Sequence, residues 1–196
     1  MNRIQIAFNK SALIICIIFS SLTSCTEDYQ PKPNGYFRIA LEEKNYEKYD
    51  NPDCPFSFEY PNYSEIQPSN KDACWINLHS NQYNATIHLT YKNITENMEE
   101  VIGESIRLTY EHTSKADGID EQFFSNDSSN VFALMFDIIG DAASDIQFIA
   151  TDSADHFLRG ALYFNVSPNE DSLAPLHNYF KEDIIHLIET LEWKDK

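Results

Sequence analysis

Positive charge is scarce in this 196-residue chain, where 14 lysine and arginine residues stand against 31 aspartate and glutamate residues. The formal net charge is -17 at pH 7. A surface of this sign repels phosphate backbones, so we do not expect a nucleic acid as partner. The hydrophobic fraction of 42% is nevertheless that of a globular protein. The length is sufficient for one well-filled core.

Glycine is also scarce, and the motifs of several enzyme classes are missing. The five glycines form no glycine-rich phosphate loop, and the G-x-S-x-G turn of many hydrolases does not occur. The six histidines show no pair at metal-ligand spacing. His186, with Glu189 three residues later, is predicted to lie on the solvent side of a helix. We therefore expect no metal, no cofactor and no enzymatic activity.

No apolar run reaches the roughly 20 residues that a membrane-spanning helix needs. The most apolar segment, residues 12–19, follows a start that carries Arg3 and Lys10 but no acid. A basic start, a short apolar run and small residues after it are typical of a secretory signal peptide. Residues 22–25 read LTSC and resemble the bacterial lipobox, in which the cysteine is acylated and the peptide is cut just before it.

We therefore predict a signal peptide over residues 1–24, with Cys25 as the lipid anchor of the mature protein. An ordinary cleaved signal and an uncleaved signal anchor are the alternatives. Residues 25–35 contain two prolines and are predicted to form an extended tether. The acyl chains would hold the protein on a membrane facing the periplasm. Thr26, the residue after the cysteine, favours the outer over the inner membrane.

Two cysteines remain in the part of the chain predicted to fold, Cys54 and Cys74. An even number of cysteines in an exported protein favours a disulfide. Cys54 shares strand parity with Phe56, and Cys74 shares it with Ile76, so both are predicted to face the core. Two buried free thiols are the alternative.

The periodicity of apolar residues predicts a series of strands and two amphipathic helices. The expected helices are 95–112, with Thr95 as N-cap, and 172–191, with Ser172 as N-cap. The run VFALMFDII (131–139) is apolar on both parities and is expected to be a central strand covered on both sides. The remaining expected strands are 56–61, 74–80, 84–92, 122–125, 145–152 and 156–166, and residues 35–41 are expected to form a short strand or a docking segment.

The strands fall into two groups, each followed by a long helix. This order predicts a single α+β domain over residues 36–196, with an antiparallel sheet flanked by two amphipathic helices. The order of its elements also resembles the PsbP-like fold.

Asp137 is unusual because it interrupts the apolar run 131–139. A buried carboxylate requires a partner, and Arg159 in FLRGALYF is the only cation in the last predicted strands. We therefore predict a buried ion pair between Asp137 and Arg159. A pocket near these two residues that serves ligand binding or catalysis is the alternative.

The segment EHTSKADGIDEQFFSN (111–126) is polar and follows the first predicted helix. Polar connections of this kind usually lie on the surface. We expect it to be either a loop that faces a partner or a solvated connection.

Several segments together resemble one family, the gliding-motility lipoprotein GldD family of the Bacteroidota. They are LTSCTEDYQPKPNGYFRI, CPFSFEYP, CWINL, EHTSKADGIDEQFFSN, FLRGALYFN, DSLAP and DIIHLIETLEW. The resemblance implies an envelope lipoprotein needed for surface gliding and tied to the type IX secretion machinery, whose other envelope proteins would be its partners. It implies no enzymatic activity, and it carries over only Cys25, as the lipidated position. A chaperone-like factor for other motility lipoproteins is a weaker alternative.

Overall fold

The computed structural model describes residues 39–69, 72–94, 97–111, 116–167 and 169–194. The chain divides into two units, 1–35 and 36–196, and all described residues belong to the second. The predicted signal peptide and tether, with Cys25, therefore lie outside the described residues, and so does Thr95. The elements are β1 (Tyr46–Tyr49), β2 (Phe56–Pro61), β3 (Glu65–Pro68), β4 (Ile76–Ser80), β5 (Ala85–Asn93), α2 (Met98–Glu111), β6 (Ala116–Asn126), β7 (Val131–Gly140), β8 (Ile146–Thr151), β9 (His156–Phe164), α3 (Glu170–Glu189) and β10 (Glu192–Trp193).

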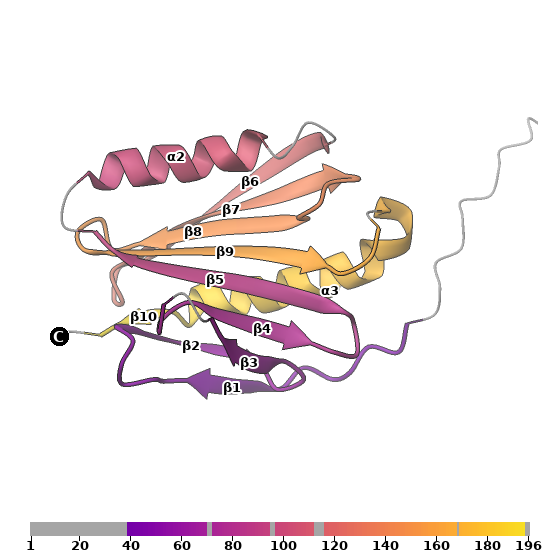
Figure 1. Cartoon of the computed structure of the whole chain (residues 1–196), viewed down its shortest axis with the longest axis horizontal. Helices are drawn as coiled ribbons and strands as arrows, with labels where there is room; N and C mark the ends of the chain where they lie inside the picture. Colours follow the sequence, from indigo (N-terminus) through magenta and orange to yellow (C-terminus); the bar gives the residue numbers. More distant parts are fainter. Residues whose placement is uncertain (1–38, 70–71, 95–96, 112–115, 168, 195–196) are drawn as a thin grey trace, which may run out of the picture. The chain divides into compact units, whose positions relative to one another are not determined.

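Seven strands form an antiparallel sheet in the order β3-β4-β5-β9-β8-β7-β6 (Figure 1). Strands β5 and β9 pair along their whole length, from Ala85 opposite Phe164 to Asn93 opposite His156. Strand β7, which we expected at the centre, is instead the neighbour of the edge strand β6. Its side chains are apolar at both odd and even positions because both faces of the strand are covered. Met135 lies in the core beneath α3, and Leu134 packs beneath α2.

The two helices cover opposite faces of this sheet (Figure 1). On one face, Val101, Ile102 and Ile106 of α2 pack against Ile149 and Phe157. On the other face, the apolar stripe of α3 enters the main core, to which it contributes Leu176, Phe180, Ile184, Leu187 and Ile188. The predicted class, an α+β fold whose antiparallel sheet is flanked by two helices, is confirmed. None of the helices in the described part of the chain is both long and apolar enough to span a membrane.

A second, three-stranded sheet with the order β1-β2-β10 packs against α3. Its strand β2 inserts the fully buried rings of Phe56 and Phe58 into the main core. Strand β10, which follows α3, completes this sheet, because Trp193 pairs with Phe56. Because the large sheet covers one side of α3 and the small sheet covers another, the apolar residues of this helix extend over a wide arc of its surface.

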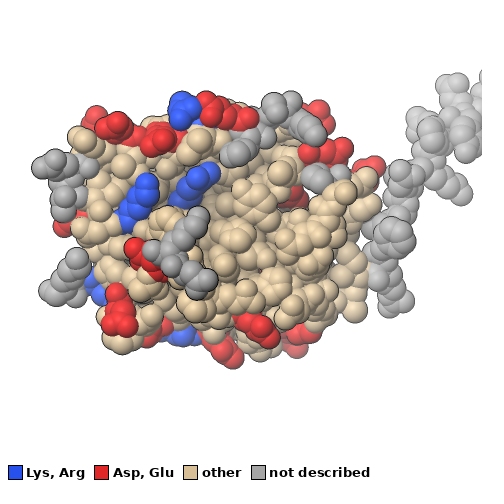
Figure 2. Space-filling view, viewed as in Figure 1, with Lys and Arg blue, Asp and Glu red and all other residues tan. Residues whose placement is uncertain are grey.

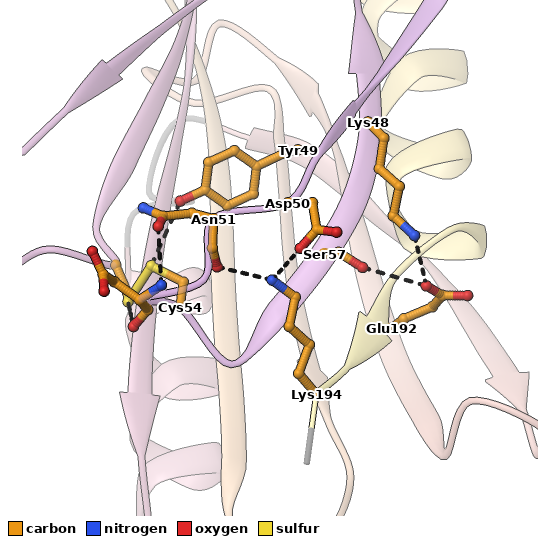
Figure 3. A network of polar contacts seen from close by, with 10 residues as sticks. Lys48, Tyr49, Asp50, Asn51, Cys54, Ser57, Glu192 and Lys194 are labelled. Atoms are coloured by element: carbon orange, nitrogen blue, oxygen red, sulfur yellow. Dashed lines mark hydrogen bonds and ion pairs between the residues drawn. A yellow bond between two sulfur atoms is a disulfide. The ribbon is translucent and has the colours of Figure 1, made fainter. Parts of the chain in front are cut away.

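Ion pairs fix the C-terminal strand in the small sheet (Figure 3). Glu192 Oε2 lies 3.0 Å from Lys48 Nζ and accepts a hydrogen bond from Ser57 Oγ at 3.3 Å. Lys194 Nζ lies 2.5 Å from Asp50 Oδ1 and donates to the backbone carbonyl of Asn51 at 2.8 Å. These contacts tie β1 and β10 to each other across β2, which lies between them.

The short strands β1, β3 and β10 were not predicted, and other elements differ from the prediction in part. Residues 39–45 form no strand, and β1 begins only at Tyr46. The strand expected at 122–125 is part of the longer β6. The N-cap of α3 is Asn169 rather than Ser172, because Asn169 has an extended backbone and its Oδ1 accepts the Ser172 N–H at 2.9 Å.

Candidate functional site

Asp137 is held by two cations of α3. Its Oδ1 lies 2.9 Å from His177 Nε2, and its Oδ2 accepts a hydrogen bond from Lys181 Nζ. The other ring nitrogen of His177, Nδ1, lies 3.6 Å from Asp145 Oδ2. His177 and Lys181 are four residues apart and so lie on the same side of the helix. The cluster therefore joins α3 to the end of β7 and the start of β8.

The predicted ion pair between Asp137 and Arg159 is wrong, because the two residues lie on opposite faces of the sheet. Asp137 pairs with Ile146, which belongs to the core beneath α3. Arg159 pairs with Ile149, which belongs to the cluster beneath α2. Directly paired residues of an antiparallel sheet share a face. Arg159 Nη2 donates instead to Gln147 Oε1 at 2.8 Å, and the alternative of one pocket containing both Asp137 and Arg159 is wrong for the same reason.

Hydrogen bonding within the cluster sets its protonation. Burial opposes ionisation of Asp137, but hydrogen bonds from His177 and Lys181 outweigh it and lower the pKa of the carboxyl group. Burial lowers the pKa of His177, yet its hydrogen bonds to Asp137 and Asp145 overcome this and raise the pKa to about 9. His177 is therefore an imidazolium at neutral pH. An imidazolium has no free lone pair, so it does not act as a general base there.

A cavity of about 190 Å³ opens beside this cluster, between the first turns of α3 and the end of β7. Its charged walls are Asp137, Asp145, His177 and Glu170. Three of these four groups are already paired with each other, so the geometry presents a salt-bridged wall rather than an activated nucleophile. Among the described residues, no group of three or more His, Cys, Asp and Glu side chains is arranged to hold a metal ion.

A second buried carboxylate, Asp183, was not singled out by the sequence analysis. It is only 1% exposed. It accepts hydrogen bonds from Tyr46 Oη at 2.9 Å and from Tyr63 Oη, and Lys44 Nζ lies 3.0 Å from its Oδ1. Burial, and then the charge of Asp183, raise the pKa of Tyr63 and keep it a neutral donor. One signal was available: Asp183 lies three residues after Phe180, within the apolar stripe of the helix.

His186 is also paired, contrary to our expectation of a solvent-facing side chain. Its Nε2 lies 2.7 Å from Glu59 Oε2, and its ring stacks on Tyr46 with the ring centroids 3.7 Å apart. The expectation fails because the small sheet covers this side of α3. The residue serves in packing between β1, β2 and the helix.

The structure contains the predicted disulfide between Cys54 and Cys74, whose Cα atoms are 5.4 Å apart. Both residues are buried. They lie just before β2 and β4 rather than within the strands. Since β2 belongs to the small sheet and β4 to the large one, the disulfide links the two sheets.

The segment expected to be a loop is for the most part an edge strand. Residues 116–126 form β6, and residues 112–115 lie outside the described part of the chain. Phe123 on this strand is 66% exposed. A groove of about 540 Å³ lies beside it, lined by Phe123, Phe124, Val131 and Ile188 among others. Whether this edge faces a partner stays a prediction.

Comparison with known proteins identifies a family and a similar solved structure. The model of the family described as gliding motility lipoprotein GldD matches residues 26–193. No curated protein matches the chain. Among solved structures, the chain is similar to the solution structure of cyanobacterial PsbP (CyanoP) from Synechocystis sp. PCC 6803, at 9% sequence identity and a TM-score of 0.48, over 83% of this chain and 99% of that chain. Because the family match extends over most of its length, the chain belongs to the gliding motility lipoprotein GldD family.

Proposed function

We propose that this protein is a non-catalytic accessory component of the gliding and type IX secretion machinery. Acyl chains on Cys25 hold it on a membrane of the cell envelope, the outer membrane in preference to the inner. Family membership supports the association with gliding and the lipid anchor. The pairing of Asp137, His177 and Lys181 supports a non-catalytic role, because it leaves these groups engaged in holding α3 to the sheet.

The edge position of β6 is the observation that carries a binding role. This strand has 11 residues and, among the described residues, pairs with β7 alone, so its other side presents backbone N–H and C=O groups. Natural edge strands are usually short or carry lysine or proline, which discourage the addition of another strand. Strand β6 is long and contains neither residue; its charged side chains are all acidic, and its register shift is confined to Ala116–Gly118 at its start. An extended segment of a partner can add to such an edge through main-chain hydrogen bonds.

The side chains around this edge favour a basic, extended partner. Asp117, Asp120 and Glu121 are exposed along the strand. Asp127 and Glu189 line the groove beside it. A partner segment with lysine or arginine side chains would complement these carboxylates, while an apolar side chain would rest on Phe123.

The substitution Phe123→Lys tests this proposal in the gliding organism. It places a positive charge on the edge without touching the core, so the protein level is expected to stay unchanged while gliding and secretion are lost. Val166→Lys is the matched control, because Val166 is 49% exposed and follows the end of β9, which β8 and β7 separate from β6 in the sheet. A photo-crosslinking residue at Ser125 is expected to capture an envelope protein of the machinery, and Phe123→Lys is expected to abolish that crosslink. Normal gliding of the Phe123→Lys strain would overturn the proposal.

A further inference from the structure

A second cavity lies on the opposite face of the large sheet from α3, beneath α2. Its volume is about 230 Å³. It is distinct from the cluster at Asp137, since Arg159 on its wall projects from the other face of the sheet. The walls that matter here are Trp75, Lys92, Glu104, Ser105, Phe157 and Arg159.

The cavity gathers positive charge in a strongly acidic chain. Lys92 and Arg159 line it, against the single carboxylate of Glu104. In the described part of the chain, no ion pair involves either cation. Acidic residues outnumber cations by 31 to 14 in the sequence. Two cations left without a carboxylate partner in such a chain are therefore notable, and they favour a negatively charged ligand.

A hydrogen bond to the buried side chain of Gln147 orients the guanidinium of Arg159. Its Nη2 donates to Gln147 Oε1 at 2.8 Å, and the same oxygen accepts from Thr109 Oγ1 at 3.2 Å. Gln147 is 1% exposed, so the guanidinium rests on a buried and fixed amide. This arrangement orients the cation without neutralising it, as a binding site requires.

Two buried donors in this group lack an acceptor, and one of them, Arg159 Nε, belongs to a residue that lines the cavity. Among the described residues, neither Arg159 Nε nor Gln147 Nε2 has a hydrogen-bond partner. Leaving buried donors unsatisfied costs free energy, and such groups are few in native proteins. A partly buried guanidinium without a counter-charge also costs free energy. A bound oxyanion supplies both negative charge and acceptor oxygens.

The surface around the cavity allows an anion to approach. On this face β4, β5 and β9 carry no carboxylate; their side chains are Asn77, His79, Thr86, His88, Thr90, Lys92, Phe157, Arg159, Ala161 and Tyr163. In Figure 2 this face of the molecule has a broad area without charged side chains. Lysine or arginine side chains lie beside this area, and most acidic side chains lie along the outline of the molecule. The carboxylates on this face are therefore confined to its margins, among them Glu65 on the edge strand β3 and Glu104 on α2, and the strands around Lys92 and Arg159 offer no like charge to an anion.

We infer that the cavity beneath α2 binds a small organic anion. A carboxylate or phosphate group lies between Lys92 and Arg159, and its apolar body rests against Trp75 and Phe157. The hydroxyl of Ser105 is available to donate to the anion. The inference is independent of a partner at β6, since it involves neither the strand nor the groove.

The fluorescence of Trp75 offers a direct test in the mature, lipidated chain held in detergent. The sequence has two tryptophans, so the variant Trp193→Phe leaves Trp75 as the only one. Hexanoate and inorganic phosphate are titrated at an ionic strength matched with sodium chloride. We expect at least one of them to give a saturable change in Trp75 emission together with a rise in Tm.

Two variants and a control decide whether the signal comes from the cavity. Lys92→Gln and Arg159→Gln, each in the Trp193→Phe background, are expected to raise the apparent Kd about ten-fold or more. Lys92 is exposed, so its variant folds even if Arg159→Gln does not. Arg107→Gln is the control, because Arg107 is an exposed cation of α2 paired with Glu111 outside the cavity. An unchanged Kd in Lys92→Gln, an equal loss in Arg107→Gln, or no saturable signal with either probe would overturn the inference. Tighter binding of dihexanoyl phosphatidic acid than of inorganic phosphate would support it and identify a lipid headgroup as the source of the anion.

Discussion

His177 is the residue whose protonation most directly ties helix to sheet. It lies between the carboxylates of Asp137 and Asp145, which belong to the end of β7 and the start of β8. As an imidazolium it holds both carboxylates. As a neutral ring it can donate only one hydrogen bond, so one carboxylate would lose its partner. Deprotonation therefore weakens the attachment of α3.

The pH dependence of unfolding follows from this pairing. Because the pKa of His177 is raised from 6.5 to about 9 by folding, its stabilisation is fully present below about pH 6.5 and is lost as pH rises through about 9. The variant His177→Gln is expected to be less stable than the natural protein by about 2 kcal/mol near pH 6, with the difference shrinking towards alkaline pH. Urea unfolding followed by circular dichroism across this pH range measures the difference.

The control for this experiment is His88→Gln. Burial lowers the pKa of His88, so this residue gains no stabilisation from its charged form. Its removal is expected to leave no loss that grows on the acidic side. A stability difference for His177→Gln that stays constant with pH would contradict the role assigned to the imidazolium.

At the residue scale, the sequence revealed which groups need partners but not which partners they have. Asp137 was singled out because it interrupts an apolar run, and it is indeed paired. Its partners come from a helix about forty residues later in the chain, and only the strand register shows that Arg159 faces the other way. Gly160 is a similar case: a Cβ atom there would lie 2.0 Å from the ring of Phe148 on β8. No local sequence pattern predicts this close approach of the Gly160 backbone to the Phe148 ring.

At the element scale, strands with one buried face were predictable and edge strands were not. The alternation in 56–61, 84–92 and 156–166 corresponds to β2, β5 and β9, each of which packs a face into the core. Strand β6 is exposed along most of its length, so no apolar alternation distinguishes it from a polar connection. The same exposure that hid it from the sequence analysis makes it available to a partner.

The disulfide acts at this scale, because it fixes the start of β2 to the start of β4. The two cysteines are 20 residues apart, and closing a loop of this size contributes about 3 kcal/mol to stability in the chain-entropy model. Reduction is therefore expected to lower the free energy of unfolding by about this amount, measured by urea unfolding with and without dithiothreitol. The double variant Cys54→Ser with Cys74→Ser serves as control: it should show the same loss without reductant and no further loss with it. Equal stability of the oxidised and reduced protein would rule out this contribution.

At the scale of the whole molecule, the class of fold was predictable and the second sheet was not. Two amphipathic helices and an antiparallel sheet follow from periodicity alone. The small sheet, however, joins β2 to β10, with Ser57 opposite Glu192. A two-residue strand carries no periodic signal, and its partner is 135 residues away. The breadth of the apolar stripe on α3 was the one hint that this helix is covered on more than one side.

Membrane attachment is the property of the whole molecule that depends on a single side chain. If Cys25 is acylated, Cys25→Ser removes the acceptor thiol, and several acyl chains, each stabilised by about 0.8 kcal/mol per buried methylene group, are lost at once. We expect the variant to lose incorporation of labelled palmitate in growing cells and to fail to support gliding. The double variant Cys54→Ser with Cys74→Ser is the matched control, because it removes two thiols of the folded unit and should keep the label. Palmitate labelling that persists in Cys25→Ser would contradict the lipid anchor, whereas an unlabelled natural protein that stays with the membrane would indicate an uncleaved signal anchor.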